Sequence, residues 1–327
     1  QLIINLFLIQ TMQTFNDILN SNQYTSTYET CRGCENHCSV RLFHFANGST
    51  FYSGNNCEKI YSNRTDSVLQ GINMFVEKYK LLFHRDAEIK KSQLKIGLPR
   101  ALGIYENYPF WHALFSYCGI KVVLSQPSTN TLYERGIHTV MADNICFPAK
   151  LMHGHIYNLI SRGVDRIFYP YVVYEQKEDK HSANTFNCPI VSGYSDVIRS
   201  AIDPSDRHSI PLDSPTISFN NPQLLQKSCC EYLTSLGIDK TTAIAAVNVA
   251  QQAQNEYKIA LTNRNNEVLQ RAIADRRMVI LLAGRPYHID PLIEHKISHA
   301  IADMGVDVIT TDIAFNHTSS VLSMGIP

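Results

Sequence analysis

Hydrophobic and polar positions along the chain follow two periods that alternate. Short apolar runs are typical of buried strands, and longer stretches with apolar residues three and four positions apart are typical of amphipathic helices. The short runs predict strands at 95–98, 120–124, 137–142, 164–169 and 188–192. The longer stretches predict helices at 66–83, 109–119 and 148–163, and another after residue 193. Strands that alternate with helices in this way predict a parallel sheet with right-handed crossovers.

The second half of the chain is organised differently. A segment rich in proline and serine, 204–222, predicts a crossing between domains. After it the pattern predicts helices at 222–236 and 241–274, a strand at 278–283, a helix at 291–304 and a strand at 306–310. A sheet of two strands leaves edges uncovered, so we expect this last α/β domain to be incomplete.

These patterns predict an α/β protein with two Rossmann-like parallel-sheet domains, the second truncated, together with an N-terminal Cys-rich metal knuckle and a helical connector. A chain of 327 residues agrees with about two domains. The expected segments are a leader or upstream extension at 1–23, a Cys-rich metal-binding module with one helix at 24–90, a first Rossmann-like domain at 91–215, a helical connector at 216–277 and the start of a second Rossmann-like domain at 278–327.

Charge and composition exclude several classes of partner. The 29 basic residues balance the 29 acidic ones, so the net charge indicates neither nucleic acid nor an anionic membrane surface as a partner. No apolar run approaches the roughly 18 residues of a membrane span, and the apolar start of the chain lacks the basic region of a signal peptide. Nine cysteines in such a chain favour reduced thiols and metal ligation over disulfides, so we expect a cytoplasmic protein.

Four of the nine cysteines are spaced for one metal centre. Cys31, Cys34 and Cys38 are separated by two and three residues, which lets a single loop present three thiolates. Cys57 supplies a distant fourth. Such a set is typical of structural zinc or of an iron–sulfur cluster, and the spacing does not choose between them.

A β-hairpin is predicted within the same module. The Asn-Gly pair at 47–48 lies between apolar runs at 40–45 and 49–53. Asn-Gly is a strong signal for a tight turn between antiparallel strands. We therefore expect the metal knuckle to carry a hairpin.

Cys146 is the candidate reactive residue of the central region. It lies between the predicted strand at 137–142 and the predicted helix that Pro148 opens, at the edge of an α/β sheet where ligands gather. Unpaired N–H groups and the helix dipole favour a thiolate there, and a small buried hydrophobic residue is the alternative. The spacing of His153 and His155 places them on different helix faces, so we expect no joint metal site. We expect one of the two to support the Cys146 loop.

A second candidate loop, at 284–290, also follows a predicted strand and precedes a predicted helix. In it Arg285 could hold an anionic group bidentately, and His288 could ligate a metal, donate a hydrogen bond or relay protons. A structural hydrogen-bonding role is the alternative. If two sheets face each other, this loop and Cys146 meet across a cleft. Cys188 precedes its predicted strand, so it should lie at the opposite edge unless the loop at 174–187 doubles back.

The rest of the chain offers fewer chemical signals. No phosphate-binding loop, dinucleotide fingerprint or nucleophile elbow occurs in the sequence. Three further cysteines are expected to be packing residues: Cys118, Cys229 and Cys230.

Several short segments, in order, resemble the superfamily of 2-hydroxyacyl-CoA dehydratases and CoA-substrate-specific enzyme activases. The closest likeness is to the uncharacterised domain of the large activase-related proteins, and it runs from about residue 24 to the end of the chain. The segments are CRGCENHC at 31–38, SGNNCEK at 53–59, CFPAK at 146–150, HGH at 153–155, NCP at 187–189 and GRPYHID at 284–290.

The resemblance implies two Rossmann-like domains that hold an iron–sulfur cluster between them. Related dehydratase subunits use three cysteines for this cluster. Cys146 matches the first and Cys188 the second, and the third would belong to the second domain beyond the end of this chain. The catalytic candidates in the implied cleft are Arg285, His288 and His153. Relatives with double-cubane clusters carry out ATP-driven reductions at low potential, with the electron supplied by an ATPase activator.

Three functions agree with these observations. The preferred one is an iron–sulfur protein with a [4Fe–4S] or double-cubane cluster, which handles low-potential electrons in ATP-coupled reductive chemistry with an ATPase activator domain or protein as partner. The second is a non-catalytic zinc-knuckle scaffold that docks on an activase or dehydratase. The third is a 2-hydroxyacyl-CoA dehydratase subunit acting on an acyl-CoA substrate. A homo-oligomer is compatible with each, and the sequence leaves open whether the chain is itself a lyase or a reductase component.

Replacement of Cys34 by serine tests the knuckle. Because all four thiolates would hold one metal, Cys34→Ser should abolish metal binding there and unfold residues 31–57. In zinc knuckles, metal binding contributes roughly 10 kcal/mol or more. Metal analysis and limited proteolysis measure the two effects. A variant that keeps full metal content and protease resistance in this segment would contradict the four-cysteine site.

Overall fold

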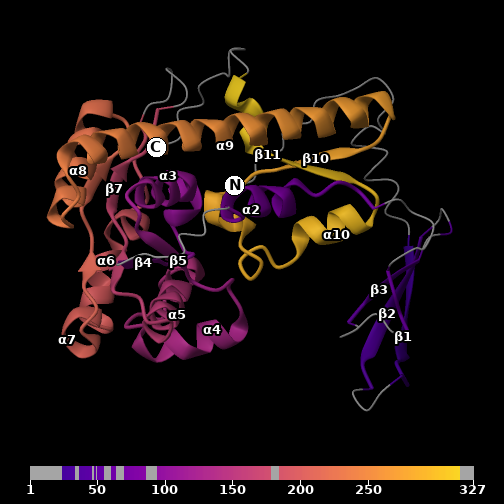
Figure 1. Ribbon diagram of the computed structural model, residues 1–327. Helices are drawn as coiled ribbons and strands as arrows, with labels where there is room; N and C mark the ends of the chain where they lie inside the picture. The colour runs from indigo at the N-terminus through magenta and orange to yellow at the C-terminus, as the bar shows by residue number, and fades with distance from the viewer. Residues whose placement is uncertain are drawn as a thin grey trace. The chain divides into compact units, whose positions relative to one another are not determined.

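The computed structural model describes residues 24–33, 37–45, 48, 50–54, 60–63, 70–85, 94–177 and 184–316. The chain divides into two compact units, one formed by Gln1–Ile72 with His299–Asp307 and the other by Asn73–Ser298 with Val308–Pro327. Figure 1 shows the elements of both. Within the described residues, no helix is both long and apolar enough to cross a membrane.

The first unit contains a three-stranded antiparallel sheet in the order β1-β2-β3. Its strands are β1 (Tyr24–Thr30), β2 (Ser39–Phe45) and β3 (Thr50–Ser53). Pairing of β2 with β3 confirms the predicted hairpin, and Gly48 between them has a positive φ of 83° that suits glycine. The pattern missed β1 because its alternation is weak: nearly every residue of this polar strand is exposed.

The second unit is built on a four-stranded sheet in the order β5-β4-β6-β8. The strands are β4 (Lys95–Leu98), β5 (Lys121–Leu124), β6 (Arg166–Phe168) and β8 (Leu212–Asp213), and each neighbouring pair is parallel. A second parallel pair joins β7 (Tyr171–Tyr174) to β9 (Thr216–Ser218). The predicted parallel α/β architecture is therefore confirmed. Because β5 and β6 lie on opposite sides of β4, the winding direction reverses there, and the carboxyl edge of β4 and β6 is a topological switch point.

The remaining elements follow in chain order. The α-helices are α2 (Met74–Phe83), α3 (Ile104–Tyr117), α4 (Asn130–Gly136), α5 (Phe147–Ser161), α6 (Pro189–Ala201), α7 (Pro204–His208), α8 (Pro222–Ser235), α9 (Lys240–Ala274) and α10 (Ile297–Asp303). Strands β10 (Val279–Leu282) and β11 (Asp307–Thr310) pair in a two-stranded sheet, and the 3-10 helices are η1 (Ile137–Thr139), η2 (Pro286–Ile289) and η3 (Thr311–Asn316). Figure 1 shows α9, in orange, extending from α8 past α3 to β10 and β11.

Two predicted strands are wrong. The segment 137–142 is a short 3-10 helix followed by residues without regular structure, and its apolar side chains include Met141, which is 74% exposed. A strand in a parallel sheet would be buried, so this apolar run lies on the surface instead. The segment 188–192 is the beginning of α6, with Pro189 in its first turn. Short apolar runs do not distinguish a buried strand from a helix, and this run forms a helix.

The predicted crossing at 204–222 is also wrong, because this segment contains α7, β8 and β9. Its strands have only two and three residues between prolines, which is too short for a periodic signal. Helix starts differ as well. Among the described residues, α2 begins after Asn73, whose side chain accepts hydrogen bonds from Phe75 N and Val76 N. Residues 291–296 form turns, so the predicted helix at 291–304 is confined to α10.

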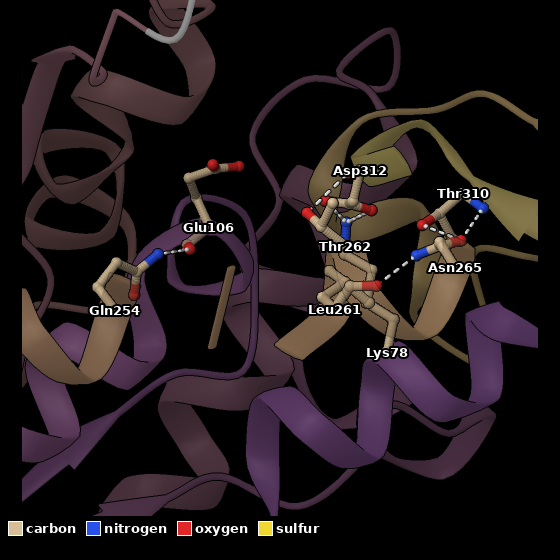
Figure 2. A network of polar contacts seen from close by, with 8 residues as sticks. All are labelled: Lys78, Glu106, Gln254, Leu261, Thr262, Asn265, Thr310 and Asp312. Atoms are coloured by element: carbon tan, nitrogen blue, oxygen red, sulfur yellow. Dashed lines mark hydrogen bonds and ion pairs between the residues drawn. The ribbon is translucent and has the colours of Figure 1, made fainter. Parts of the chain in front are cut away.

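Helix α3 begins five residues before Pro109, where the sequence placed its start, and it is kinked. Pro109 has no N–H to donate, and Asn107 has non-helical backbone angles. The side chain of Gln254 from α9 bonds to the backbone at this kink. Phe110 N donates to Gln254 Oε1 at 3.2 Å. Gln254 Nε2 donates to Glu106 O at 2.9 Å (Figure 2). One amide thus bonds to the backbone on both sides of the kink.

A second buried amide on α9 holds the following strand. Asn265 is fully buried; its Oδ1 accepts from Thr310 N at 2.8 Å, and its Nδ2 donates to Leu261 O at 2.9 Å (Figure 2). Thr262 donates to the carbonyl oxygen of Asp312, whose carboxylate pairs with Lys78 of α2 at 2.8 Å. Helix α9 therefore binds α3, β11 and η3 through specific polar contacts as well as apolar packing.

Replacement of Gln254 by leucine should destabilise the second unit. The variant removes the hydrogen bonds that Gln254 makes to Phe110 N and Glu106 O, and each lost bond costs about 1–3 kcal/mol, so we expect a loss of about 2–6 kcal/mol in the free energy of unfolding. Urea unfolding followed by circular dichroism measures it. Gln252→Leu, on an exposed face of the same helix, is the control and should change the free energy by about 0.5 kcal/mol or less. Equal effects in both variants would contradict the role of Gln254.

Candidate functional site

The loops that follow β4 and β6 meet at the switch point of the parallel sheet. The loop after β4 leads to Gly103 at the start of α3. The loop after β6 contains the buried Tyr169, which donates from its hydroxyl to Val191 O in the first turns of α6 at 2.7 Å. A Cβ on Gly103 would lie 3.9 Å from this hydroxyl and 3.4 Å from Val191 Cγ1. The N-terminal ends of α3 and α6 are therefore close together at this edge.

Cys146 is the N-cap residue of α5, with Pro148 in the first turn, as the sequence indicates. Its side chain is exposed. The residues before it do not form a strand; they are turns that follow η1. The predicted helix terminus is therefore confirmed, while its predicted position after a strand is wrong.

Cys188 occupies the same position on the next helix. It is the N-cap residue of α6, with Pro189 following it, and its side chain is partly exposed. Because 188–192 is helical, the sequence-based objection that Cys188 lies at the opposite edge no longer holds. Asn187 fixes the approach to it: its side chain donates to Val172 O at 3.0 Å and to Glu175 Oε1 at 2.7 Å.

Tyr287 connects both cysteines with the loop at 284–290. Burial raises the pKa of Tyr287, the positive charge of Arg285 lowers it, and the negative charges of Cys146 and Cys188 raise it further. Charges act on each other in this way only at short range. Tyr287 therefore lies within electrostatic range of Arg285, Cys146 and Cys188.

The loop at 284–290 folds back on itself. His288 Nδ1 accepts a hydrogen bond from the backbone N–H of Arg285 at 3.0 Å, which leaves the proton of a neutral ring on Nε2. A Cβ on Gly284 would lie 2.6 Å from His288 Nδ1, so the loop requires glycine there. Burial and the charge of Arg285 lower the pKa of His288. The Arg285 side chain is exposed. This loop therefore offers a cation and a neutral N–H donor.

His153 lies inside the unit, between α5 and α6. Its side chain is fully buried; Nδ1 is 2.8 Å from Thr139 Oγ1 and Nε2 is 2.9 Å from the Tyr194 hydroxyl. The Thr139 hydroxyl donates to Gly136 O, so it accepts from His153, and Tyr194 donates to the other ring nitrogen. Burial, with the charge of Cys146, raises the pKa of Tyr194 to about 12. The geometry gives His153 a positioning role behind Cys146 rather than contact with a ligand.

His155 faces a different network, as the spacing of the two histidines predicts. Its Nδ1 is 2.8 Å from Ser125 Oγ and its Nε2 is 3.1 Å from Ser128 Oγ. Ser128 donates to the carboxylate of Asp290, and Ser125 accepts from the backbone N–H of Arg100 at 2.7 Å. The proton of His155 therefore lies on Nε2, and the chain of donors runs from Arg100 to Asp290.

Asp290 ends the loop that holds Arg285 and His288, and it is fully buried. One carboxylate oxygen accepts from Ser128 and from the Tyr105 hydroxyl at 2.5 Å; the other accepts from Leu292 N at 2.9 Å and Ile293 N at 3.3 Å. These contacts fasten the loop to α3 and to the carboxyl edge of β5. Sequence reasoning missed this network because the side chains that link its elements are bonded to residues 25 to 185 positions away. The only local signal was an aspartate at the end of a motif.

The cysteine module of the first unit is described only in part. Cys31 N donates to Cys38 O at 2.8 Å, and both side chains pack with Val40, Leu42 and aromatic neighbours in a small apolar cluster. Cys34 and Cys57 lie outside the described residues, so the four-cysteine site stays a prediction. Within the part of the chain that the structure describes, no three potential metal ligands gather in one place.

The other cysteines are packing residues in their surroundings. Cys229 is buried, and burial raises its pKa. Cys118 is half-buried at the C-terminal end of α3, where burial raises its pKa to about 11. Neither is poised to form a thiolate, which agrees with their predicted role.

The two buried histidines predict how stability depends on pH. Burial, with the charge of Arg100, lowers the pKa of His155 to about 3; burial, with the charge of His138, lowers that of His153 to about 4. The unfolded chain binds these protons near pH 6.5, so the free energy of unfolding should fall as the pH drops below 6.5 and should lose this dependence above it. Each histidine contributes a slope of at most about 1.4 kcal/mol per pH unit.

His155→Gln should make this slope shallower, since glutamine keeps a polar side chain and does not titrate. Urea unfolding at several pH values, from about pH 7 to about pH 5, measures the slope of the free energy of unfolding against pH. Ser161→Ala on the same helix removes no titratable group and should keep the full slope. An identical slope in His155→Gln and the unaltered chain would show that His155 is not held neutral by burial.

Comparison with known proteins bears on the whole of this region. A search of curated proteins found no match. A family model described as CoA enzyme activase uncharacterised domain matches residues 95–314, which is more than half of the chain. The matched region contains the parallel sheet, both cysteine-capped helices and the loop at 284–290, and it confirms the resemblance drawn from the short segments. The chain belongs to the family of the CoA enzyme activase uncharacterised domain.

Proposed function

We propose that this chain supplies thiolate ligands to an iron–sulfur cluster at the switch-point edge of the parallel sheet, and that it handles low-potential electrons there. The observation that carries the proposal is the matched placement of Cys146 and Cys188. Each caps the N-terminus of a helix, and both act electrostatically on Tyr287. The positive ends of two helices would offset the negative charge of a thiolate-ligated cluster.

The residues present fit such a cluster in part. Cys146 and Cys188 are at least partly exposed, so their sulfur atoms are accessible to iron. A [4Fe–4S] cluster takes four cysteine ligands, and two thiolates supply half of them. The other ligands would come from another polypeptide chain or from residues that the structure does not describe. When bound, the cluster would accept and donate one electron at a time.

The loop at 284–290 would define the other side of this site. Arg285 would bind an anionic group of a substrate or partner, because its guanidinium is exposed and always charged. Neutral His288 would donate a hydrogen bond from Nε2, since Nδ1 already accepts from the backbone. His153 would keep Tyr194 and the start of α5 in position. Asp290 would keep the loop in place without touching the ligand.

Family membership supports the choice of partner. The matched description names a CoA enzyme activase, which agrees with an ATPase activator domain or protein as the electron donor and with an acyl-CoA compound as the substrate of the assembly. Zinc or a second cluster at the four-cysteine knuckle would then have a structural role.

Iron analysis of cysteine variants tests the proposal. The chain would be reconstituted anaerobically with iron and sulfide, in a background where Cys31, Cys34, Cys38 and Cys57 are serine so that the knuckle binds no iron. Cys146→Ala and Cys188→Ala should each lower the iron content and alter the paramagnetic signal after reduction with dithionite. Loss of one small exposed side chain costs about 1 kcal/mol or less, so the fold should persist.

Cys118→Ala is the matched control, because Cys118 is a half-buried packing residue at the other end of α3. It should keep the iron content and the signal of the background chain. Equal iron in Cys146→Ala and the background would contradict the proposed site. So would a background chain that assembles no cluster at all.

A further inference from the structure

A hollow lies at the C-terminal end of α3, away from Cys146 and Cys188. Its volume is about 460 Å³, and it is bounded by the C-terminal end of α2, the last turns of α3 and one residue of α9. The lining residues are His84, Arg85, His112, Ala113, Ser116, Tyr117 and Val249. Among these described residues none is acidic, one is a permanent cation and four others carry polar side chains.

Two backbone carbonyl groups hold Arg85 in place, and they use only part of its guanidinium. Nε donates to Leu82 O at 3.3 Å and Nη2 to Leu81 O at 3.1 Å, which are free carbonyls at the end of α2. The guanidinium carbon lies 5.6 Å from the centre of the Tyr257 ring. Burial lowers the pKa of Arg85, which means that its charge is incompletely solvated. These contacts use Nε and one N–H of Nη2, so Nη1 remains for a ligand.

His112 is the second polar group of the hollow. Burial and the charge of Arg85 lower its pKa to about 4, so it is neutral at pH 7. The groups around it are Arg85 and His84 from the end of α2, Tyr108 and Tyr117 on its own helix, and uncharged Val249 from α9. Two further groups of α9, Glu256 and Tyr257, act on the charge of Arg85. Burial is the larger cause of the low pKa of His112, and the charge of Arg85 adds to it. An anion placed between the two side chains would offset the contribution of Arg85.

We propose that this hollow binds an oxyanion, the phosphate or carboxylate group of a small molecule, between Arg85 and His112. The guanidinium supplies paired N–H donors for the anion, and Ser116 and Tyr117 supply hydroxyl groups. Ala113 and Val249 form an apolar wall for the uncharged part of the molecule. Binding is coupled to protonation of His112, so the affinity rises as the pH falls from neutrality toward 4.

The protonation of His112, followed by nuclear magnetic resonance, tests the proposal directly. Sulfate is the probe because it does not titrate in this range, and chloride at equal ionic strength controls for screening. Sulfate should raise the pKa of His112 by about one unit or more, which is the usual size of a shift caused by a close opposite charge. His112→Asn identifies the resonance. Acetate in a parallel titration shows whether a carboxylate acts as sulfate does.

Arg85→Gln should abolish the shift, and Lys80→Gln, which removes an exposed cation from the last turn of α2, should retain it. If Arg85→Gln fails to fold, Arg85→Lys replaces it; a lysine keeps the charge and loses the planar donor pair, so the shift should shrink. The proposal is overturned if neither sulfate nor acetate moves the pKa of His112 beyond its value in chloride. It is overturned equally if the shift persists undiminished in the Arg85 variant.

Discussion

A carboxylate buried among hydroxyl groups is the constraint on which the second unit depends. Asp290 is wholly removed from solvent, and its oxygens are bonded by Tyr105, Ser128 and two backbone N–H groups. Burying a charged group costs several kcal/mol unless every hydrogen bond is made. The loop at 284–290, the start of α3 and the loop after β5 must therefore reach their places together. Because His155 bonds to both Ser125 and Ser128, α5 is drawn into the same arrangement.

Buried polar contacts also position α5 and α6, the two helices that Cys146 and Cys188 precede. His153 joins η1 to α6 through two hydrogen bonds, and Glu175 joins Asn107 of the α3 kink to Asn187 beside Cys188. Neither histidine of the HGH segment needs to touch a ligand for its identity to matter. Each is an uncharged connector whose two ring nitrogens face different elements. The positions of Cys146 and Cys188 are thus set by polar side chains that lie deeper in the unit.

Local patterns predicted the elements whose signal is strong and repeated. Helices α8 and α9, strands β4 and β5 and the β2–β3 hairpin follow from periodicity, caps and an Asn-Gly turn. The candidate residues Cys146, Arg285 and His288 were found because motifs are local as well. The strand predicted after Cys188 argued against placing it beside Cys146, and that strand is wrong because an apolar run of five residues suits a helix or a strand.

The partners of Asp290 and Gln254 could not be predicted, because each pairing joins segments more than 140 residues apart. A single sequence does not show which distant hydroxyl group donates a hydrogen bond to a buried carboxylate. Strands of two or three residues, such as β8 and β9, carry too few positions to show alternation. The features that could not be predicted from the sequence are therefore mainly long-range polar contacts and very short strands.

The spacing of the two buried amides on α9 has a consequence for how this helix can change in length. Gln254 and Asn265 are eleven residues apart, which in a helix is close to three whole turns, so they lie within about 20° of each other on one face. One added or deleted residue between them would rotate one amide by about 100° relative to the other. The kink of α3 and the strand β11 could then not both be bonded. This part of α9 should therefore tolerate the exchange of side chains on its outer face, but not the insertion of a residue.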